Sequence, residues 1–194
     1  MRFILLFGAL LLFVVSTRPV QADWEGSITT DASGSQMSGQ IHMKKDLIRA
    51  DFKTPTALSV IMNLTTAKAW VLLHMPHLAL ANDFSRYKNQ VPMCSAADVD
   101  GCLKQHGFTQ KGKETYEGHL CIVYEGHLDR KNPKTLTKLW RPTDLKEVPS
   151  LKTLVRTVDN KGSSTYIRDV KVGAQDAKLF AVPADYREIQ GMGK

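Results

Sequence analysis

The sequence lacks any apolar run long enough to cross a membrane. Its longest run, Phe3–Val15 (FILLFGALLLFVV), has 13 residues, whereas a membrane-spanning helix needs about 20. Arg2 precedes this run and the small-x-small pattern Val20-Gln21-Ala22 follows it, as is typical of a cleavable signal peptide. We expect residues 1–22 to be removed during export, with an uncleaved anchor as the alternative. No Cys stands at the cleavage point, so lipid attachment there is not expected.

A strong charge of one sign is also missing. Cleavage after Ala22 leaves 172 of the 194 residues, and the loss of two arginines lowers the net charge from +7 to +5. The basic residues are dispersed, whereas nucleic-acid binding needs a concentrated basic face, so no nucleic-acid partner is expected. We predict one domain at residues 23–187, periplasmic or secreted, and a disordered tail at 188–194. The mild basic excess favours, at most, peripheral contact with anionic lipid or an acidic partner.

Cysteine is rare, with three residues in the whole chain. An exported protein can form disulfides, and an odd count leaves one thiol unpaired within the monomer. Cys94 and Cys102 flank a short polar segment, and a bridge between them would tie down an irregular excursion. Cys121 lies in an apparent apolar strand, where a thiol acts as a small hydrophobe. We favour a Cys94–Cys102 disulfide with Cys121 free; a Cys102–Cys121 bridge is the alternative.

Catalytic and metal-binding motifs are missing as well. The sequence contains no Ser-His-Asp elbow, no HExxH, no phosphate-binding glycine loop and no paired-carboxylate pattern. Among the six histidines only His74 and His77 form a tight pair, and no third ligand follows at a recognisable spacing. A copper site that includes Met75 is the weaker alternative. We therefore expect no enzyme, no catalytic residue, no metal site and no cofactor.

Strands separated by turns dominate what is present. Alternating apolar residues predict strands at 24–30, 36–44, 47–52, 57–64, 68–75, 114–127, 136–141 and 163–172. Residues 77–87 have near-helical spacing, and a second short helix is expected within 94–106. Asp159-Asn160-Lys161-Gly162 is typical of a hairpin turn. Because βαβ alternation is missing, we predict a mainly β (α+β) domain: a curved antiparallel sheet, or partly open barrel, covered by short helices.

Short motifs in the C-terminal half resemble those of a known superfamily. They are Gly112-Lys-Glu-Thr-Tyr-Glu-Gly118, Leu139-Trp140, Val148-Pro149 and the closing Phe180-Ala-Val-Pro183-Ala-Asp-Tyr186. Their order is similar to that in a family of exported bacterial proteins with a LolA/LolB-like fold, the fold of the periplasmic lipoprotein carriers. The resemblance implies a half-barrel of antiparallel strands that cups helices around an apolar cavity. In that superfamily the cavity holds lipids or lipoprotein acyl chains.

The resemblance directs attention to apolar strand residues that would line such a cavity. Val60 and Met62 share one strand face, Trp70 and Leu72 share another, and we expect these faces to converge on the concave side. The candidate lining residues are Val60, Met62, Trp70, Leu72, Leu120, Ile122 and Tyr124. We expect a non-enzymatic binding protein that shelters a lipid, an acyl chain or a lipidated partner. Two alternatives stay open: an ordinary core, or an envelope protein-interaction or sensing module without a small ligand.

Overall fold

The computed structural model describes most of the chain after residue 22. The described residues are 23–32, 34–53, 57–85, 94, 98–127, 135–157 and 162–190. The expected signal peptide (1–22), most of the expected hairpin turn (159–161) and the last part of the expected tail (191–194) lie outside these ranges.

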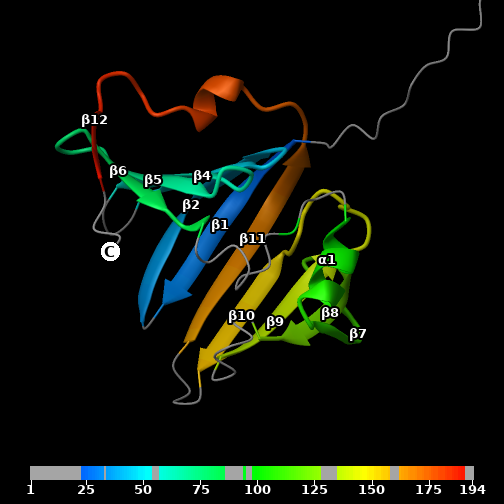
Figure 1. Ribbon diagram of the computed structural model, residues 1–194. Helices are drawn as coiled ribbons and strands as arrows, with labels where there is room; N and C mark the ends of the chain where they lie inside the picture. Colours follow the sequence, from blue (N-terminus) through cyan, green and yellow to red (C-terminus); the bar gives the residue numbers. More distant parts are fainter. Residues whose placement is uncertain are drawn as a thin grey trace, which may run out of the picture.

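Twelve strands in the described ranges form a single sheet (Figure 1). In chain order they are β1 (Trp24–Ala32), β2 (Ser35–Lys44), β3 (Leu47–Phe52), β4 (Leu58–Asn63), β5 (Lys68–Leu73), β6 (Leu78–Asp83), β7 (Thr109–Tyr116), β8 (His119–Gly126), β9 (Thr135–Pro142), β10 (Lys152–Thr157), β11 (Gly162–Val172) and β12 (Arg187–Gln190). Across the sheet the order is β12-β6-β5-β4-β3-β2-β1-β11-β10-β9-β8-β7. Neighbours pair antiparallel except β12, which runs parallel to β6. The predicted mainly β, antiparallel sheet is confirmed, and it is open, with β12 and β7 at its edges.

Strand β1 joins two halves of the sheet. Strands β1 to β6 form one meander in chain order, and β7 to β11 form a second. The halves meet where β1, paired with β2 on one side, pairs with β11 on the other. Figure 1 shows the two halves turned toward each other, so that the sheet curls and has an inner and an outer face.

Two short helical segments pack on opposite faces. The helix α1 (Val99–Gln105) lies on the inner face, where its buried Val99 and Leu103 pack with residues of β8 and β9. The 3-10 helix η3 (Ala177–Phe180) lies on the outer side, above β4 in Figure 1. The helix expected within 94–106 is therefore confirmed. The prediction of a sheet covered by several short helices is not, since α1 is the single α-helix of the described residues.

The helix predicted at residues 77–87 is wrong over Leu78–Asp83, and residues 86 and 87 lie outside the described ranges. Leu78–Asp83 instead forms β6, which pairs with β5 so that Leu78 stands opposite Leu73. The apolar residues of this segment fit both the spacing of a helix and the alternation of a strand. Pairing with β5 favours the strand, because strand preference depends on cross-strand neighbours.

The predicted long strand at 114–127 is two strands. Glu117 (φ 48°) and Gly118 (φ 81°) separate β7 from β8, and two successive positive φ values are typical of a type I′ hairpin turn. At the C-terminus, β12 carries the fold to Gln190, three residues beyond the predicted domain end at 187.

The largest core cluster lies where the two halves meet. Its buried members are Trp24, Ile28, Ile41, Met43, Ala50, Phe52, Cys121, Val123, Trp140, Val148, Leu151 and Ile167. Trp24 is 1% exposed, and its indole Nε1 donates to the carbonyl of Glu147 at 3.1 Å. A buried indole N–H needs such an acceptor, and here the bond ties β1 to the connection between β9 and β10.

Gly39 tests how closely β2 and β3 approach each other. A Cβ at this position would lie 1.8 Å from the carbonyl oxygen of Asp51 on β3, so Gly39→Ala must push the two strands apart. We expect a loss of about 1–3 kcal/mol in the free energy of unfolding, the usual cost of overpacking. Gly173→Ala is the control, because a Cβ there meets no atom within 4 Å. Urea unfolding measures the difference, and equal stability of the two variants would contradict the close approach.

Candidate functional site

Strand pairing assigns each side chain to a face, because residues directly opposite each other on neighbouring strands point to the same side. Val60 stands opposite Ala50, and Ala50 stands opposite Ile41. Met62 stands opposite Ile48. Ile41 alternates along β2 with Gly39, which cross-strand pairs through β1, β11 and β10 connect to Leu139, a residue packed with α1 on the inner face. Val60 and Met62 therefore lie on the inner face of the sheet.

Three further candidates lie on the same face in the other half of the sheet. The connecting cross-strand pairs are Gly39 with Ile28, Ile28 with Ile167, Thr165 with Thr153, Thr153 with Leu139, and Leu139 with Tyr124. Leu120 and Ile122 alternate with Tyr124 along β8 and so point to the same side. Five of the seven predicted lining residues therefore share the inner face.

Trp70 and Leu72 lie on the outer face. Trp70 stands opposite Ile61, and Leu72 stands opposite Ser59; both partners alternate with Val60 along β4. The predicted convergence of Trp70 and Leu72 with the β4 candidates is therefore wrong. A shift of one residue in strand pairing moves every side chain of a strand to the other face, and the apolar pattern of β5, which has hydrophobic residues on both sides, did not fix that register.

A C-terminal strap, residues 174–186, covers this part of the outer face. Its Val182 and Tyr186 pack with the buried cluster Ile61, Leu72 and Ala79, and Trp70 packs against the same cluster. Leu72 is 0% exposed, so it belongs to the core beneath the strap. The Nε1 atom of Trp70 is buried without a hydrogen-bond partner among the described residues.

A chain of polar side chains beneath the strap was missed by sequence reasoning. Arg49 Nε donates to Asp51 Oδ1 at 2.8 Å, and the Ser59 hydroxyl donates to the same carboxylate. Because the Ser59 hydroxyl hydrogen is donated to Asp51, Ser59 Oγ acts as the acceptor toward His74. His74 Nε2 therefore donates to Ser59 Oγ at 3.0 Å. His74 Nδ1 then accepts from the Tyr186 hydroxyl. Ser59 is 0% exposed, so the chain fastens the strap to β3–β5 and presents no accessible nucleophile.

The inner face of β3–β6 is apolar and only half-buried. The side chains that share this state are Ile48, Leu58, Val60, Met62, Val71, Leu73, Leu78 and Leu80. On the outer face of the same strands, the residues beneath the strap are fully buried. A concave, mostly apolar surface is what an apolar ligand requires, and these strands retain one on the inner side.

The three candidates on β8 differ in how much of each side chain is covered by other residues of the protein. Tyr124 is 2% exposed beneath α1, and its hydroxyl donates to Asp100 Oδ1 at 2.9 Å. Burial, followed by this hydrogen bond, raises the pKa of Tyr124 to about 12. Ile122 packs against the same cluster beneath α1, whereas Leu120 is 47% exposed. Leu120 is therefore the β8 candidate that is free to contact a ligand.

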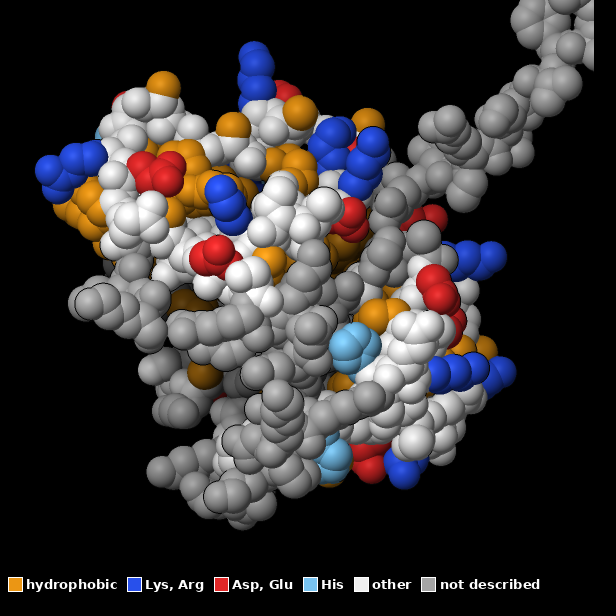
Figure 2. Space-filling model, viewed as in Figure 1, with side chains coloured by type: hydrophobic (Ala, Val, Ile, Leu, Met, Phe, Trp, Pro, Cys, Tyr) orange, Lys and Arg blue, Asp and Glu red, His pale blue; other side chains and the backbone are white. Residues whose placement is uncertain are grey.

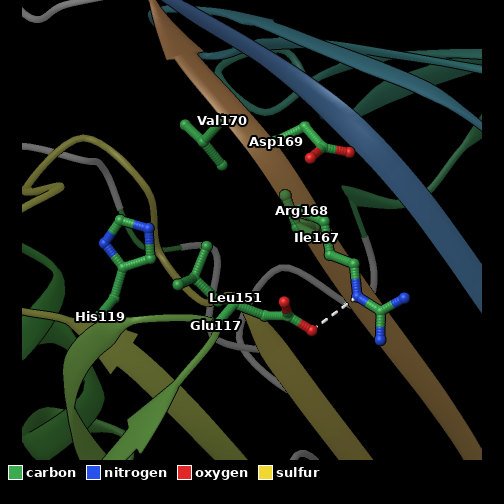
Figure 3. A pocket seen from close by; sticks show the side chains of 7 residues that line it. All are labelled: Glu117, His119, Leu151, Ile167, Arg168, Asp169 and Val170. Carbon is green, nitrogen blue, oxygen red and sulfur yellow. Dashed lines mark ion pairs between the residues drawn. The ribbon is translucent and has the colours of Figure 1, made fainter.

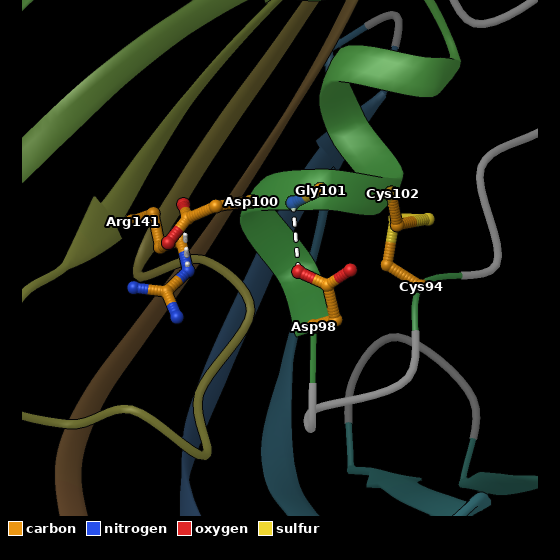
Figure 4. Close-up of a disulfide and its surroundings, with 6 residues drawn as sticks. All are labelled: Cys94, Asp98, Asp100, Gly101, Cys102 and Arg141. Atoms are coloured by element: carbon orange, nitrogen blue, oxygen red, sulfur yellow. Dashed lines mark hydrogen bonds and ion pairs between the residues drawn. A yellow bond between two sulfur atoms is a disulfide. The ribbon is translucent and has the colours of Figure 1, made fainter.

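The disulfide expected between Cys94 and Cys102 is present. Figure 4 shows the bridge beside α1, with Asp98 at the start of the helix. Asp98 Oδ1 accepts a backbone N–H of the first turn at 2.9 Å, as an N-cap does. Arg141 Nε on β9 lies 3.3 Å from Asp100 Oδ1. The bridge and these contacts hold α1 against the inner face.

Cys121 is the free thiol, as expected. It is 0% exposed and belongs to the core cluster. Burial, followed by the nearby carboxylate of Asp144, raises the pKa of the thiol. The group therefore stays protonated and packs as a small hydrophobe.

A second surface, the outer groove, lies on the outer face of β8–β10. It has a volume of about 270 Å³ and is lined by Glu125, Leu136, Lys138, Trp140, Lys152, Leu154 and Arg156. The ammonium groups of Lys138 and Lys152 lie 4.6 and 4.4 Å from the ring centre of Trp140, within the range of cation–π attraction. Trp140 Nε1 donates to Glu114 Oε2 at 2.6 Å, and Lys138 Nζ lies 3.2 Å from Glu114 Oε1. The bond from Trp140, followed by that from Lys138, lowers the pKa of Glu114.

A third cavity, also of about 270 Å³, lies beside the irregular pairing of β1 and β11 (Figure 3). Arg168 and Glu117 meet at 2.9 Å, and His119 Nδ1 lies 2.7 Å from Asp144. Asp169 (φ 51°) accepts from a β1 hydroxyl at 3.0 Å. Each of these charged side chains has a partner within the protein. No group of three or more His, Cys, Asp or Glu in the described ranges is arranged to hold a metal ion.

Charge is dispersed over the visible surface. Figure 2 shows Lys and Arg side chains spread over the visible face, with Asp and Glu side chains between several of them. Hydrophobic side chains gather at the upper left of this view, over β4–β6 and the strap. Among the helices that the structure describes, none has the length and apolar character of a membrane span.

Comparison with known proteins identifies the fold. No protein-family model and no curated protein matches the sequence. The MucA/MucB complex of Pseudomonas aeruginosa matches with a TM-score of 0.56 at 12% identity, over 88% of this chain and 59% of that chain. A structure of MucB in complex with MucA(peri) matches with a TM-score of 0.53 at 13% identity, over 86% and 56%. The chain therefore has the fold of the matched part of MucB and spans less than two thirds of the MucB chain.

The superfamily expected from the sequence is also among the matches. A LolA superfamily protein from Nitrosomonas europaea matches with a TM-score of 0.42 at 15% identity, over 84% of this chain and 91% of that chain.

Trp70 tests the assignment of the two faces. Because it packs on the outer face against the cluster beneath the strap, Trp70→Ala should lower the free energy of unfolding by about 2 kcal/mol or more. It should leave the affinity for an apolar probe on the inner face unchanged. Urea unfolding and titration with a fluorescent fatty acid measure the two effects, and Trp70→Phe is the control that keeps most of the packing. Loss of probe affinity at unchanged stability would place Trp70 at the ligand instead.

Glu114 should make stability depend on pH. Its folded-state pKa is lowered from 4.5 by hydrogen bonds from Trp140 and Lys138. Such a carboxylate stabilises the fold above its unfolded-state pKa, and this contribution is lost as pH falls through the folded-state pKa. Wild type should therefore exceed Glu114→Gln in stability at neutral pH, and the difference should shrink on acidification. Urea unfolding from neutral pH to about pH 3 tests this; a difference that does not change with pH would contradict it.

Proposed function

We propose that this chain is an exported, non-enzymatic binding protein that shelters an apolar ligand on the inner face of its sheet. The ligand class is a lipid, an acyl chain or a lipidated partner. The observation that supports this most is the contrast between the two faces of β3–β6. The outer face is closed by the strap, whereas the inner face presents half-buried apolar side chains around Val60 and Met62.

An acyl chain is long enough to bind such a face usefully. Each methylene group removed from water contributes about 0.8 kcal/mol, so ten methylenes contribute about 8 kcal/mol. A micromolar dissociation constant corresponds to about −8 kcal/mol, and association and ordering oppose binding. We therefore infer that chains longer than about ten carbons are held at micromolar concentrations or below.

An exported location, periplasmic or secreted, is part of the proposal. It follows from the expected cleavage after Ala22. The Cys94–Cys102 bridge supports it, because disulfides persist in oxidising compartments.

A protein partner is the second candidate. Structures of MucB, whose matched part shares this fold, include complexes with MucA. This favours an envelope protein-interaction or sensing role, in which a protein segment takes the place of the small ligand. The lipid-binding and protein-binding functions coincide when the protein partner carries an acyl chain. When the partner carries none, binding of an acyl probe distinguishes the two functions.

Met62 and Met75 provide a paired test. Met62 is half-buried on the inner face, and Met75 (91% exposed) lies in the turn between β5 and β6, outside both surfaces. Met62→Gln should weaken binding of a fluorescent fatty acid about fivefold, since a partly buried apolar side chain contributes about 1 kcal/mol. Met75→Gln should leave the affinity unchanged, and thermal unfolding checks that both variants stay folded. If wild type shows no saturable binding of the acyl probe, the apolar-ligand proposal fails and the protein-partner candidate replaces it.

A further inference from the structure

The outer groove has no part in the proposed ligand site, because it lies on the other face of the sheet. On β10, Lys152, Leu154 and Arg156 point to the same side. On β9, Lys138 stands opposite Leu154 and Leu136 stands opposite Arg156. The two leucines therefore form an apolar floor between three cationic side chains.

Two of these cations form no ion pair within 4 Å among the described residues, although Lys152 lies close enough to Glu114 to help lower the pKa of that carboxylate. Glu114 bonds to Lys138, and Glu125, the acidic residue of the groove lining, lies 3.6 Å from Lys111. Among the described residues, no ion pair is found for Lys152 or Arg156. The groove therefore has more positive than negative charge beside an apolar surface, and this combination complements an anionic amphiphile.

Aromatic rings extend this surface on both sides of Lys152. Its ammonium lies 4.4 Å from the ring centre of Trp140, 5.4 Å from that of Tyr116 and 5.9 Å from that of Tyr166. Trp140 is 4% exposed and forms the base of the groove, whereas Tyr116 and Tyr166 are half-buried beside it. Tyr is one of the residues that sit at the boundary between lipid headgroups and acyl chains. Basic side chains beside them add attraction to anionic headgroups.

We propose that the outer groove docks the protein on an anionic membrane surface. Lys152 and Arg156 contact lipid phosphates, and Leu136 and Leu154 contact the methylenes next to the headgroups. The proposal that the groove binds a membrane is argued from the geometry of the groove alone. The biological role of this binding rests on the proposed function, because docking would bring a protein that shelters acyl chains to the membrane that contains such chains.

A lipid surface fits the groove better than a small anion or an extended peptide does. The Cα atoms of Lys152 and Arg156 are about 13 Å apart along one strand, so the extended side chains reach two separate phosphates of a lipid surface. β9 and β10 are interior strands, paired on both sides. A peptide therefore cannot add to them as a new strand, whereas a membrane needs only side-chain contacts.

Vesicle binding tests the proposal with the full chain. We would measure co-sedimentation with vesicles of phosphatidylcholine alone and of an equal mixture with phosphatidylglycerol. Wild type should bind the mixed vesicles and not the neutral ones, and added salt should release it, because salt screens charge. Lys152→Gln and Arg156→Gln should each weaken binding about fivefold.

Lys113→Gln is the matched control. Lys113 is an exposed cation on β7 that stands opposite Ile122, and so points to the inner side. Its removal should change binding less than twofold, about the limit of such a measurement. Arg156 is exposed, so Arg156→Gln keeps the test valid even if Lys152→Gln unfolds the protein.

Three results would overturn membrane docking. They are equal binding to neutral and mixed vesicles, an equal loss in Lys113→Gln, and full displacement by inorganic phosphate at an ionic strength at which sodium chloride leaves the protein bound, which would indicate a small-anion site. The acyl-probe titration is done without vesicles. Docking and acyl binding can therefore fail separately, and each failure is recognised by its own assay.

Discussion

The pairing of β1 with β11 is the contact on which the rest of the sheet depends. Each half of the sheet is a meander whose strands pair with their sequence neighbours, so most pairings are local. β1 and β11 are joined across about the whole length of the domain, with Trp24 opposite Val172. Bringing together two strands so far apart in the sequence costs loop-closure entropy. The core cluster lies beside this pairing, and burial of its side chains offsets that cost. The buried Trp24, with its bond to the Glu147 carbonyl, fixes β1 to the second half.

Among the described residues, the covers of the sheet are placed diagonally. The helix α1 covers the inner face at β8 and β9, and the strap covers the outer face at β4 to β6. The other two quarters are the inner face of β3–β5 and the outer face of β8–β10. The first is apolar and half-buried; the second has apolar side chains between cations. This arrangement separates the proposed acyl site from the proposed membrane contact, so one can be occupied without blocking the other.

The sequence predicted what local alternation and turns determine. β3 was predicted with its observed bounds, and β2 and β4 within one residue, because each is an apolar-polar alternation between turns. Cys94 and Cys102 were paired correctly because a short polar loop separates them. The pairing register was harder. β5 is apolar on both faces, so its pattern cannot say which face carries Trp70, and the error moved two of seven candidates to the wrong side.

Long-range polar contacts could not be predicted at all. His74 and Tyr186 are 112 residues apart, and neither belongs to a motif that would connect them. Their bond makes sense only when the fold is known, because residues 174–186 include no strand and η3 is a single short turn. Such a segment cannot pair its polar groups through the backbone hydrogen bonds of a β-sheet, and buried polar groups need partners. The hydrogen-bonded side chains from Arg49 to Tyr186 supply them, and Arg49 Nη1 also donates to the carbonyl of Leu179 in the strap, so the strap has one defined position. A strap fixed in this way keeps the outer face of β4–β6 closed, and an apolar ligand that reaches these strands must therefore approach from the inner face.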